Sequence, residues 1–289
     1  MASRVDFAGS AALVDSLTSV VSAAAAAILA ARSRALEIET KSDLSPVTAA
    51  DRAAETVLLA GLARLLPDVP VVSEEAVERA TPAPLADSFL LVDPLDGTRE
   101  LVAGRDEFTV NVALVRGGVP RLGIVAAPAQ ALIWRGIEGI GAERLELAPG
   151  ADASAGRHHT AIRTRPCPRS RLVVAVSRSH LDPRTEAFLA RLPVAERRAC
   201  GSAVKFCQVA EGAVDLYPRL ATTCEWDIAA GHAIVAAAGG AVTTPRGDAL
   251  RYGAVDAGFR VPEFVAWGDR RQMIEGGGQR AGDRGTHGR

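Results

Sequence analysis

The stretch Leu90-Leu91-Val92-Asp93-Pro94-Leu95-Asp96-Gly97-Thr98 changes abruptly from apolar to polar residues. Its apolar start predicts a buried strand, and the proline, glycine and aspartates that follow predict a sharp turn. Such a turn can direct Asp93, Asp96 and the Leu95 carbonyl into one small volume. Buried carboxylates repel each other unless a cation neutralises them, and hard oxygen ligands suit Mg²⁺. The stretch therefore predicts a metal site or, as the simpler alternative, an Asp-rich turn before an ordinary helix.

Other polar groups occur where predicted strands end or helices begin. Gly97 and Thr98 supply backbone N–H groups at such a point, and these can bind a phosphate. Ser73-Glu74-Glu75 follows a short apolar segment, and Glu225-Trp226-Asp227 opens a long Ala-rich segment. Acidic residues are also common in the first turn of any helix, so the spacing alone leaves both interpretations open.

The composition is that of a globular chain, with 289 residues of which 48% are hydrophobic and 23% charged. A net charge of −1 gives no electrostatic reason for a nucleic-acid or membrane partner. We find no signal peptide, and the most apolar segment, 20–31, has 12 residues where a membrane span needs about 20. The four cysteines show no paired spacing, which is typical of reduced thiols: Cys167, Cys200, Cys207 and Cys224. We therefore expect a cytoplasmic protein without a transmembrane segment.

The first half of the chain reads as a sheet flanked by two helices. Helical spacing of apolar residues predicts a helix over 10–33. Thr48 and Asp51 have capping-box spacing and predict a second helix over about 49–66. Besides the quoted strand, short apolar or alternating segments predict strands over 69–72, 108–115, 122–127 and 131–135. This pattern indicates an antiparallel meander.

The second half alternates between strands and helices, which indicates an α/β domain. We expect strands over 171–176, 194–198 and 213–217, and helices over 182–191, 201–211 and 225–239. A Gly-, Ala- and Ser-rich segment over 149–160 predicts the boundary between a domain of residues 1–155 and one of 156–275. The Gly- and Arg-rich residues 276–289 predict a disordered tail.

Three separate motifs, in the same order, resemble those of the inositol-monophosphatase superfamily of Mg²⁺-dependent phosphomonoesterases. They are Glu74-Glu75 after a short strand, the Asp-Pro-Leu-Asp-Gly-Thr turn of residues 93–98, and Trp226-Asp227-Ile228-Ala229-Ala230 at a helix start. The resemblance implies a layered αβαβα sugar-phosphatase fold, with an antiparallel-sheet N-terminal half and an α/β C-terminal half.

Within this superfamily the chain is most similar to the bacterial 3′(2′),5′-bisphosphate nucleotidases of the CysQ type. The resemblance extends over residues 10–268, and both lysines of the chain, Lys41 and Lys205, fall inside it. The matching segments are Lys41–Thr48, Glu107–Asn111, Ser177–His180, Gly201–Cys207, Ala210–Gly212, Asp215–Arg219, Glu225–Asp227 and Phe264–Gly268.

The resemblance implies a catalytic centre with two or three Mg²⁺ ions. Its metal ligands would be Glu74, Asp93, the Leu95 carbonyl, Asp96 and Asp227. Thr98 would orient the attacking water, and either Glu74 or Asp51 would be the carboxylate that accepts a hydrogen bond from Thr98. No covalent nucleophile is needed for such an in-line displacement.

The implied substrate is adenosine 3′,5′-bisphosphate, which would lose its 3′-phosphate and give AMP, with Li⁺ as an inhibitor. Lys205 and Arg178 are expected to lie away from the metal-binding turns and to bind the second phosphate. The residues implied in substrate binding are Gly97, Thr98, Ser177, Arg178, His180, Ser202, Lys205 and Asp227.

Two other functions remain open at this point. One is an inositol monophosphatase or fructose bisphosphatase on the same scaffold, and the other is a catalytically silent protein that senses the nucleotide. A homodimer and peripheral association with the cytoplasmic face of the inner membrane, as in relatives, also remain open. One departure from the family pattern is Ala254, which follows Tyr252-Gly253 where a lysine is usual. The residues before Phe264 also lack the family's usual Asn-Pro order. If this segment contacts the nucleotide, we expect weaker binding or broader specificity.

Overall fold

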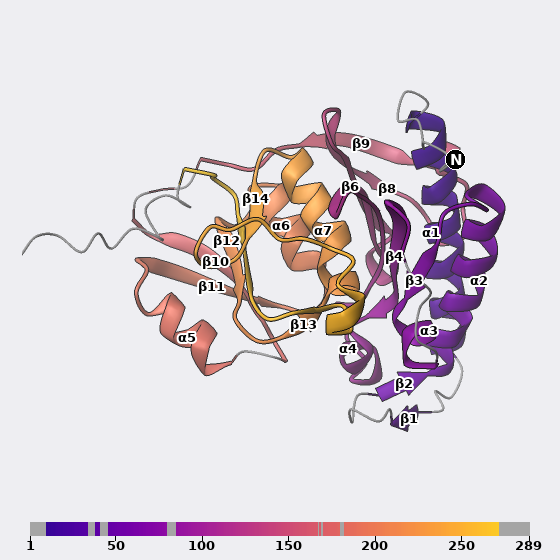
Figure 1. Ribbon diagram of the computed structural model, residues 1–289, viewed down its shortest axis with the longest axis horizontal. Helices are drawn as coiled ribbons and strands as arrows, with labels where there is room; N and C mark the ends of the chain where they lie inside the picture. Colours follow the sequence, from indigo (N-terminus) through magenta and orange to yellow (C-terminus); the bar gives the residue numbers. More distant parts are fainter. Residues whose placement is uncertain are drawn as a thin grey trace, which may run out of the picture.

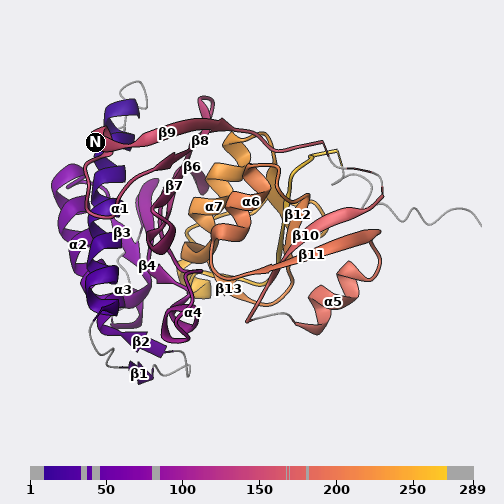
Figure 2. The ribbon, with the colours of Figure 1, turned by 180° about the vertical axis from the view of Figure 1, so that it is seen from behind.

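The computed structural model describes residues 10–33, 38–40, 46–79, 85–166, 168, 170–179 and 182–271. The predicted tail, the segment 41–45 and His180 lie outside these residues. The described residues form alternating layers of helices and sheets, which Figure 1 shows side by side and Figure 2 shows from behind. This arrangement confirms the predicted αβαβα architecture.

The first sheet contains the Asp-rich stretch on β4, the strand next to its edge strand β3. It has seven strands in the order β3-β4-β5-β6-β7-β8-β9, with β3 parallel to β4 and the other neighbours antiparallel. The strands are β3 (Val71–Ser73), β4 (Ser88–Asp96), β5 (Thr109–Arg116), β6 (Val119–Ala127), β7 (Leu132–Ile137), β8 (Gly141–Glu146) and β9 (Arg157–Ile162). The predicted meander is thus confirmed, but the sheet also contains β8 and β9. The whole of β9 lies after residue 155, so the first sheet includes residues of the second predicted domain.

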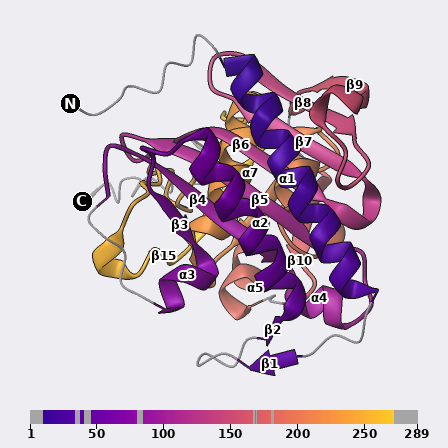
Figure 3. The ribbon, with the colours of Figure 1, turned by 90° about the vertical axis from the view of Figure 1, so that its right-hand side faces the viewer.

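Two long helices cover one face of this sheet, as Figure 3 shows: α1 (Ser10–Arg32) and α2 (Ala49–Leu65). With 23 residues, α1 exceeds the predicted apolar segment, and by length and composition alone it could cross a membrane. However, Leu17, Val21 and Ile28 are fully buried, in a cluster shared with α2 and the sheet. Such burial is typical of a core helix in a soluble fold.

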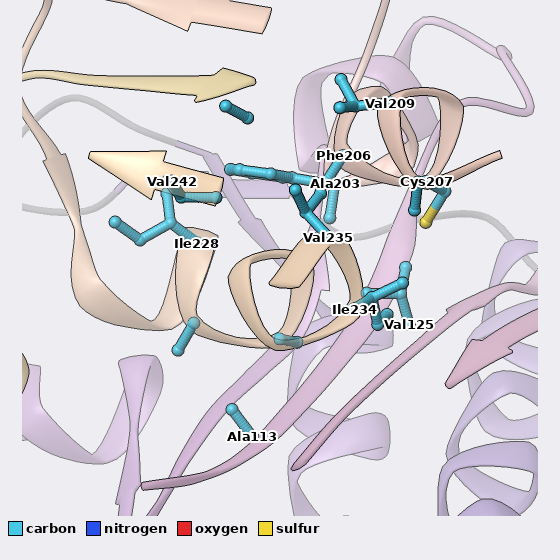
Figure 4. Packing of buried hydrophobic residues seen from close by; sticks show 14 of the residues in the cluster. Ala113, Val125, Ala203, Phe206, Cys207, Val209, Ile228, Ile234, Val235 and Val242 are labelled. Atoms are coloured by element: carbon cyan, nitrogen blue, oxygen red, sulfur yellow. The ribbon is translucent and has the colours of Figure 1, made fainter. Parts of the chain in front are cut away.

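The second sheet has five strands in the order β11-β10-β12-β16-β14. Its strands are β10 (Leu172–Ser177), β11 (Val194–Cys200), β12 (Leu216–Arg219), β14 (Ala241–Thr243) and β16 (Phe264–Trp267). Two helices lie between the sheets, α6 (Val204–Ala210) and α7 (Glu225–Ala237), and α5 (Pro183–Leu189) covers the outer face. Figure 4 shows side chains of α6 and α7, among them Phe206 and Ile234, packed in the shared core.

The remaining elements are short. Two-stranded sheets pair β1 (Ile38–Thr40) with β2 (Pro46–Thr48), and β13 (Thr223–Cys224) with β15 (Arg260–Val261). The short helices are α3 (Glu74–Arg79) and α4 (Thr98–Val102), with 3₁₀ turns η2 (Pro128–Gln130), η3 (Ala153–Ala155) and η4 (Val255–Ala257).

Two glycines let α7 lie directly on the first sheet. Gly123 on β6 and Gly136 on β7 are paired across the strands. A Cβ atom at Gly123 would lie 2.2 Å from the Ala230 carbonyl oxygen, and one at Gly136 would lie 2.7 Å from the Ile234 Cα. The backbone of α7 therefore occupies space that any side chain at these positions would need.

We predict that Gly123→Ala destabilises the fold by about 2–3 kcal/mol, because backbone atoms of α7 would have to move away from the sheet. Urea unfolding followed by circular dichroism measures this free energy. Thr160→Ala on the exposed strand β9 serves as the control, and we expect its stability to change by less than about 0.5 kcal/mol. Equal unfolding midpoints for both variants would contradict the close packing of α7.

Candidate active site

The Asp-rich turn forms where β4 leaves its regular pairing with β5. Asp93 is paired opposite Asn111, and the register shifts between Asp93 and Asp96. The Leu95 amide donates to the Asp93 Oδ1 at 3.0 Å, and Gly97 has a φ of 98°, which favours glycine. The turn brings both aspartates to the wall of one cavity.

This cavity has a volume of about 310 Å³ and lies where the two halves of the chain meet. Most of the predicted site residues line it: Glu74, Asp93, Leu95, Asp96, Gly97, Thr98, Ser177, Ser202, Lys205 and Asp227. Asp51 and Arg178 are not among the lining residues, and His180 lies outside the described part of the chain. Residues as far apart in sequence as Glu74 and Arg260 thus line one cavity.

The carboxylates are close enough to raise one another's pKa. Burial raises the pKa of Asp93 well above its usual value, and the charges of Glu74, Asp96 and Asp227 raise it further. Burial and Asp227 likewise raise the pKa of Asp96 to about 7, although Lys205 and Arg219 lower it. A cation in this cavity would relieve the repulsion and favour the ionised carboxylates.

The donor set fits a hard divalent cation that retains part of its own solvent shell. Among the described residues, no three acidic, histidine or cysteine side chains form a ready metal cage. Instead, the oxygen donors are spread along the cavity wall. Mg²⁺ commonly binds in this way, through one or two carboxylates with water and substrate phosphate in its other positions.

Thr98 is held by a buried carboxylate behind the cavity wall. Its hydroxyl donates to the Asp51 Oδ1 at 3.0 Å, and the other Asp51 oxygen accepts from the Thr48 hydroxyl and amide, each at 2.7 Å. Burial raises the pKa of Asp51, and these hydrogen bonds oppose that effect. Of the two carboxylates predicted for this contact, Glu74 and Asp51, the structure has Asp51 accept from Thr98.

Asp227 lies in the first turn of α7, which extends from the cavity into the space between the sheets. The Cys224 amide donates to the Asp227 Oδ2 at 3.0 Å, and the Thr223 hydroxyl donates to the same oxygen. These bonds are typical of a capped helix start, which confirms the structural interpretation of this acidic residue. Asp227 also lines the cavity, where its carboxylate lies near those of Asp93 and Asp96.

Two cations lie beside the carboxylates. Lys205 is 3% exposed, its ammonium donates to the carbonyls of Ser202 at 2.6 Å and Cys200 at 3.3 Å, and it lies 5.1 Å from the centre of the Tyr217 ring. The expectation that Lys205 lies away from the metal-binding turns is therefore wrong. The layers fold the two halves together, so that Lys205 and Asp96 line the same cavity.

Arg219 is the second cation, and it was missed as a site residue. It ends β12 and lines the cavity, and its buried Nε has no hydrogen-bond partner among the described residues. The buried Ser202 hydroxyl, also on the cavity wall, is likewise unpartnered in the described part of the chain. The signal available in the sequence was a charged residue near the end of an apolar strand, as it was for Asp93.

Arg178 is bound by a neighbouring carboxylate. Its Nε and Nη2 donate to the two oxygens of Glu107 at 2.9 and 2.7 Å, and Nη2 also donates to the Ala199 carbonyl at 2.8 Å. The contacts in the structure thus link Arg178 to the loop before β5.

Comparison with known proteins adds independent information. Residues 12–267 match the inositol monophosphatase family. The 3′(2′),5′-bisphosphate nucleotidase CysQ of Escherichia coli K12 is 40% identical over 230 residues, which cover 78% of this chain and 89% of that protein. The crystal structure of CysQ from Bacteroides thetaiotaomicron is similar, with a TM-score of 0.72, 34% identity and coverage of 87% and 95%.

An inositol monophosphatase from Zymomonas mobilis has the same TM-score of 0.72, at 25% identity, and covers 94% of this chain and 99% of that one. The family match, the curated relative and the solved structures all span most of the chain. The protein belongs to the inositol monophosphatase family.

Proposed function

We propose that this protein is a Mg²⁺-dependent 3′(2′),5′-bisphosphate nucleotidase that hydrolyses adenosine 3′,5′-bisphosphate to AMP and phosphate. The observation that carries this proposal is that one cavity joins a group of crowded carboxylates to two enclosed cations, Lys205 and Arg219. Metal-bound carboxylates can hold the phosphate that is cleaved, and the cations can hold a second phosphate. The similarity to the CysQ relatives supports the same substrate class.

The proposed metal ligands are Glu74, Asp93, the Leu95 carbonyl, Asp96 and Asp227, for two or three Mg²⁺ ions. When bound, these ions would lower the pKa of water and stabilise the charge on the departing oxygen. Ser177, Ser202, Lys205 and Arg219 would hold the nucleotide, together with the backbone of Gly97 and Thr98.

Thr98 has the role of orienting the attacking water. Because its hydroxyl hydrogen is donated to Asp51, its oxygen can accept a hydrogen from water. The oxygen of water bonds to phosphorus and the bond from phosphorus to the 3′ oxygen breaks. The proton that the water releases ends on the 3′ oxygen, so AMP and phosphate are the products. Asp51 keeps the Thr98 hydroxyl in this orientation throughout.

A cytoplasmic location belongs to the same proposal. The three cysteines that the structure describes, Cys200, Cys207 and Cys224, are free thiols. Reduced thiols are typical of proteins in a reducing compartment.

Steady-state kinetics on a panel of phosphomonoesters tests this function. We expect the highest kcat/KM for adenosine 3′,5′-bisphosphate, ahead of adenosine 3′-monophosphate, inositol 1-phosphate and fructose 1,6-bisphosphate. A preference for either sugar phosphate would replace the proposal by one of those activities. Tight nucleotide binding without turnover of any substrate would indicate a nucleotide sensor.

For Asp93→Asn we predict loss of turnover with an intact fold. Folding raises the pKa of Asp93, so ionisation of this group costs stability at neutral pH, and removing the charge relieves that cost. In metal-free buffer the melting temperature should therefore hold or rise, whereas added Mg²⁺ should stabilise only the wild type. Wild-type activity of the variant at saturating Mg²⁺ would contradict the ligand assignment.

For Thr98→Ala we expect kcat to fall by about a hundredfold with KM changed less than about threefold, because the hydroxyl orients water and not the nucleotide. Thr56→Ala, at an exposed position on α2, is the control and should match the wild type. A defect confined to KM would show that Thr98 only holds phosphate.

For Lys205→Met we expect kcat/KM for the bisphosphate to fall about tenfold to a hundredfold, since a charged hydrogen bond contributes roughly 1.5–3 kcal/mol. Methionine keeps the volume of the buried stem. The assay uses saturating Mg²⁺, because Lys205 also lowers the pKa of Asp96. Adenosine 3′-monophosphate should be affected less than about threefold, and an equal loss on both substrates would refute the second-phosphate role.

A further inference from the structure

Glu107 lies in the loop between α4 and β5, outside the cavity, and joins the two halves of the chain. Its Oε2 accepts from the Gly201 amide at 2.8 Å and from the Arg178 Nε at 2.9 Å, and its Oε1 accepts from the Arg178 Nη2 at 2.7 Å. The Arg178 charge and these hydrogen bonds lower the pKa of Glu107. One carboxylate of the first half therefore binds two segments of the second half.

The backbone carbonyl of Glu107 lies close to two turns, the one at Gly97 and the one at Gly201. A Cβ atom on Gly97, which follows Asp96, would lie 3.0 Å from the Glu107 carbonyl oxygen. A Cβ atom on Gly201 would lie 2.7 Å from that oxygen. The Glu107 carbonyl thus lies between the turn that carries the aspartates and the turn that leads to Lys205.

The turn after Gly201 has an unfavourable backbone conformation and is stabilised by contacts with residues of the first half of the chain. Ser202 has a positive φ of 48°, which is unfavourable for a residue with a side chain. The carbonyls of Cys200 and Ser202 fix the Lys205 ammonium, so the backbone course from 200 to 202 sets the position of this charge. Thr109, two residues after Glu107, accepts from the Ala203 amide at 3.4 Å and adds a second contact.

We propose that Glu107 is a positioning residue that fixes the spacing between the metal-binding turn and the Lys205 turn, and thereby selects substrates with two phosphates. This inference rests on the proposed nucleotidase function. Glu107 acts through the Gly201 amide and Arg178 on the position of Lys205, and it does not contact the reacting phosphate. Arg178 has the same positioning role, because its guanidinium forms the ion pair with Glu107.

Glu107→Gln tests the inference, because glutamine replaces one of two acceptor oxygens by an amide donor that faces other donors. We expect KM for adenosine 3′,5′-bisphosphate to rise about tenfold with kcat changed less than about twofold. Adenosine 3′-monophosphate, which has no second phosphate, should show less than a threefold change in kcat/KM. Glu186→Gln is the matched control, because Glu186 forms a similar ion pair with Arg197 on the surface and should leave all constants unchanged.

A double-mutant cycle separates positioning from general support of the fold. If Glu107 acts through Lys205, then Glu107→Gln in a Lys205→Met background should change kcat/KM for the bisphosphate less than about twofold. Equal losses on both substrates, or losses that multiply in the double variant, would overturn the inference.

Arg178→Lys removes the two-point hydrogen bonding between Arg178 and Glu107 and leaves Glu107 unchanged. This variant is used for the test if Glu107→Gln does not fold. The same shift in KM for the bisphosphate supports the inference, and an unchanged preference overturns it. A wild-type enzyme that does not prefer the bisphosphate would instead refute the proposed function itself.

Discussion

The repulsion between carboxylates at the end of β4 is the constraint on which the site depends. Asp93 and Asp96 are brought together by a strand whose apolar residues are buried on both faces, so neither side chain can turn away without disrupting the core. Asp227 then adds a third acidic group from the start of α7. Such an arrangement is costly in a metal-free protein, and a bound cation would convert the repulsion into attraction. The proposed metal site therefore depends on the same crowding that raises the pKa of Asp93 and Asp96.

The packing of α7 determines whether these acidic groups meet. This helix touches the first sheet over Gly123 and Gly136, and its other side packs on α6 and the second sheet. Because the helix backbone approaches so closely, the position of Asp227 relative to Asp96 is set by sheet geometry and not by a flexible loop. A small shift of the helix would alter the separation of the proposed metal ligands, so we expect changes in this packing to affect activity.

The second half of the chain adds two cations, Lys205 and Arg219, to the cavity that contains the carboxylates. Lys205 is held by backbone carbonyls of its own turn. Arg219 lines the same cavity, and its buried Nε has no hydrogen-bond partner among the residues that the structure describes. Both lower the pKa of Asp96 and so offset part of the effect of burial and of the neighbouring carboxylates, although that pKa remains raised. Glu107 and Arg178 connect this region to the first half through charged hydrogen bonds, which are stronger and more directional than neutral ones.

The sequence alone determined the layered architecture, most helices and central strands, and the acidic residues that line the cavity. These features depend on local apolar patterns, turn residues and motifs, which are readable within short segments. It did not reveal β8 and β9, because β8 alternates weakly and most residues of β9 are exposed at the sheet edge. Only the tertiary structure decided that Lys205 and Arg219 lie beside Asp96 and that Glu107 binds Arg178. Each pair is at least 71 positions apart in sequence, and such distances are set by how the layers pack and not by sequence spacing.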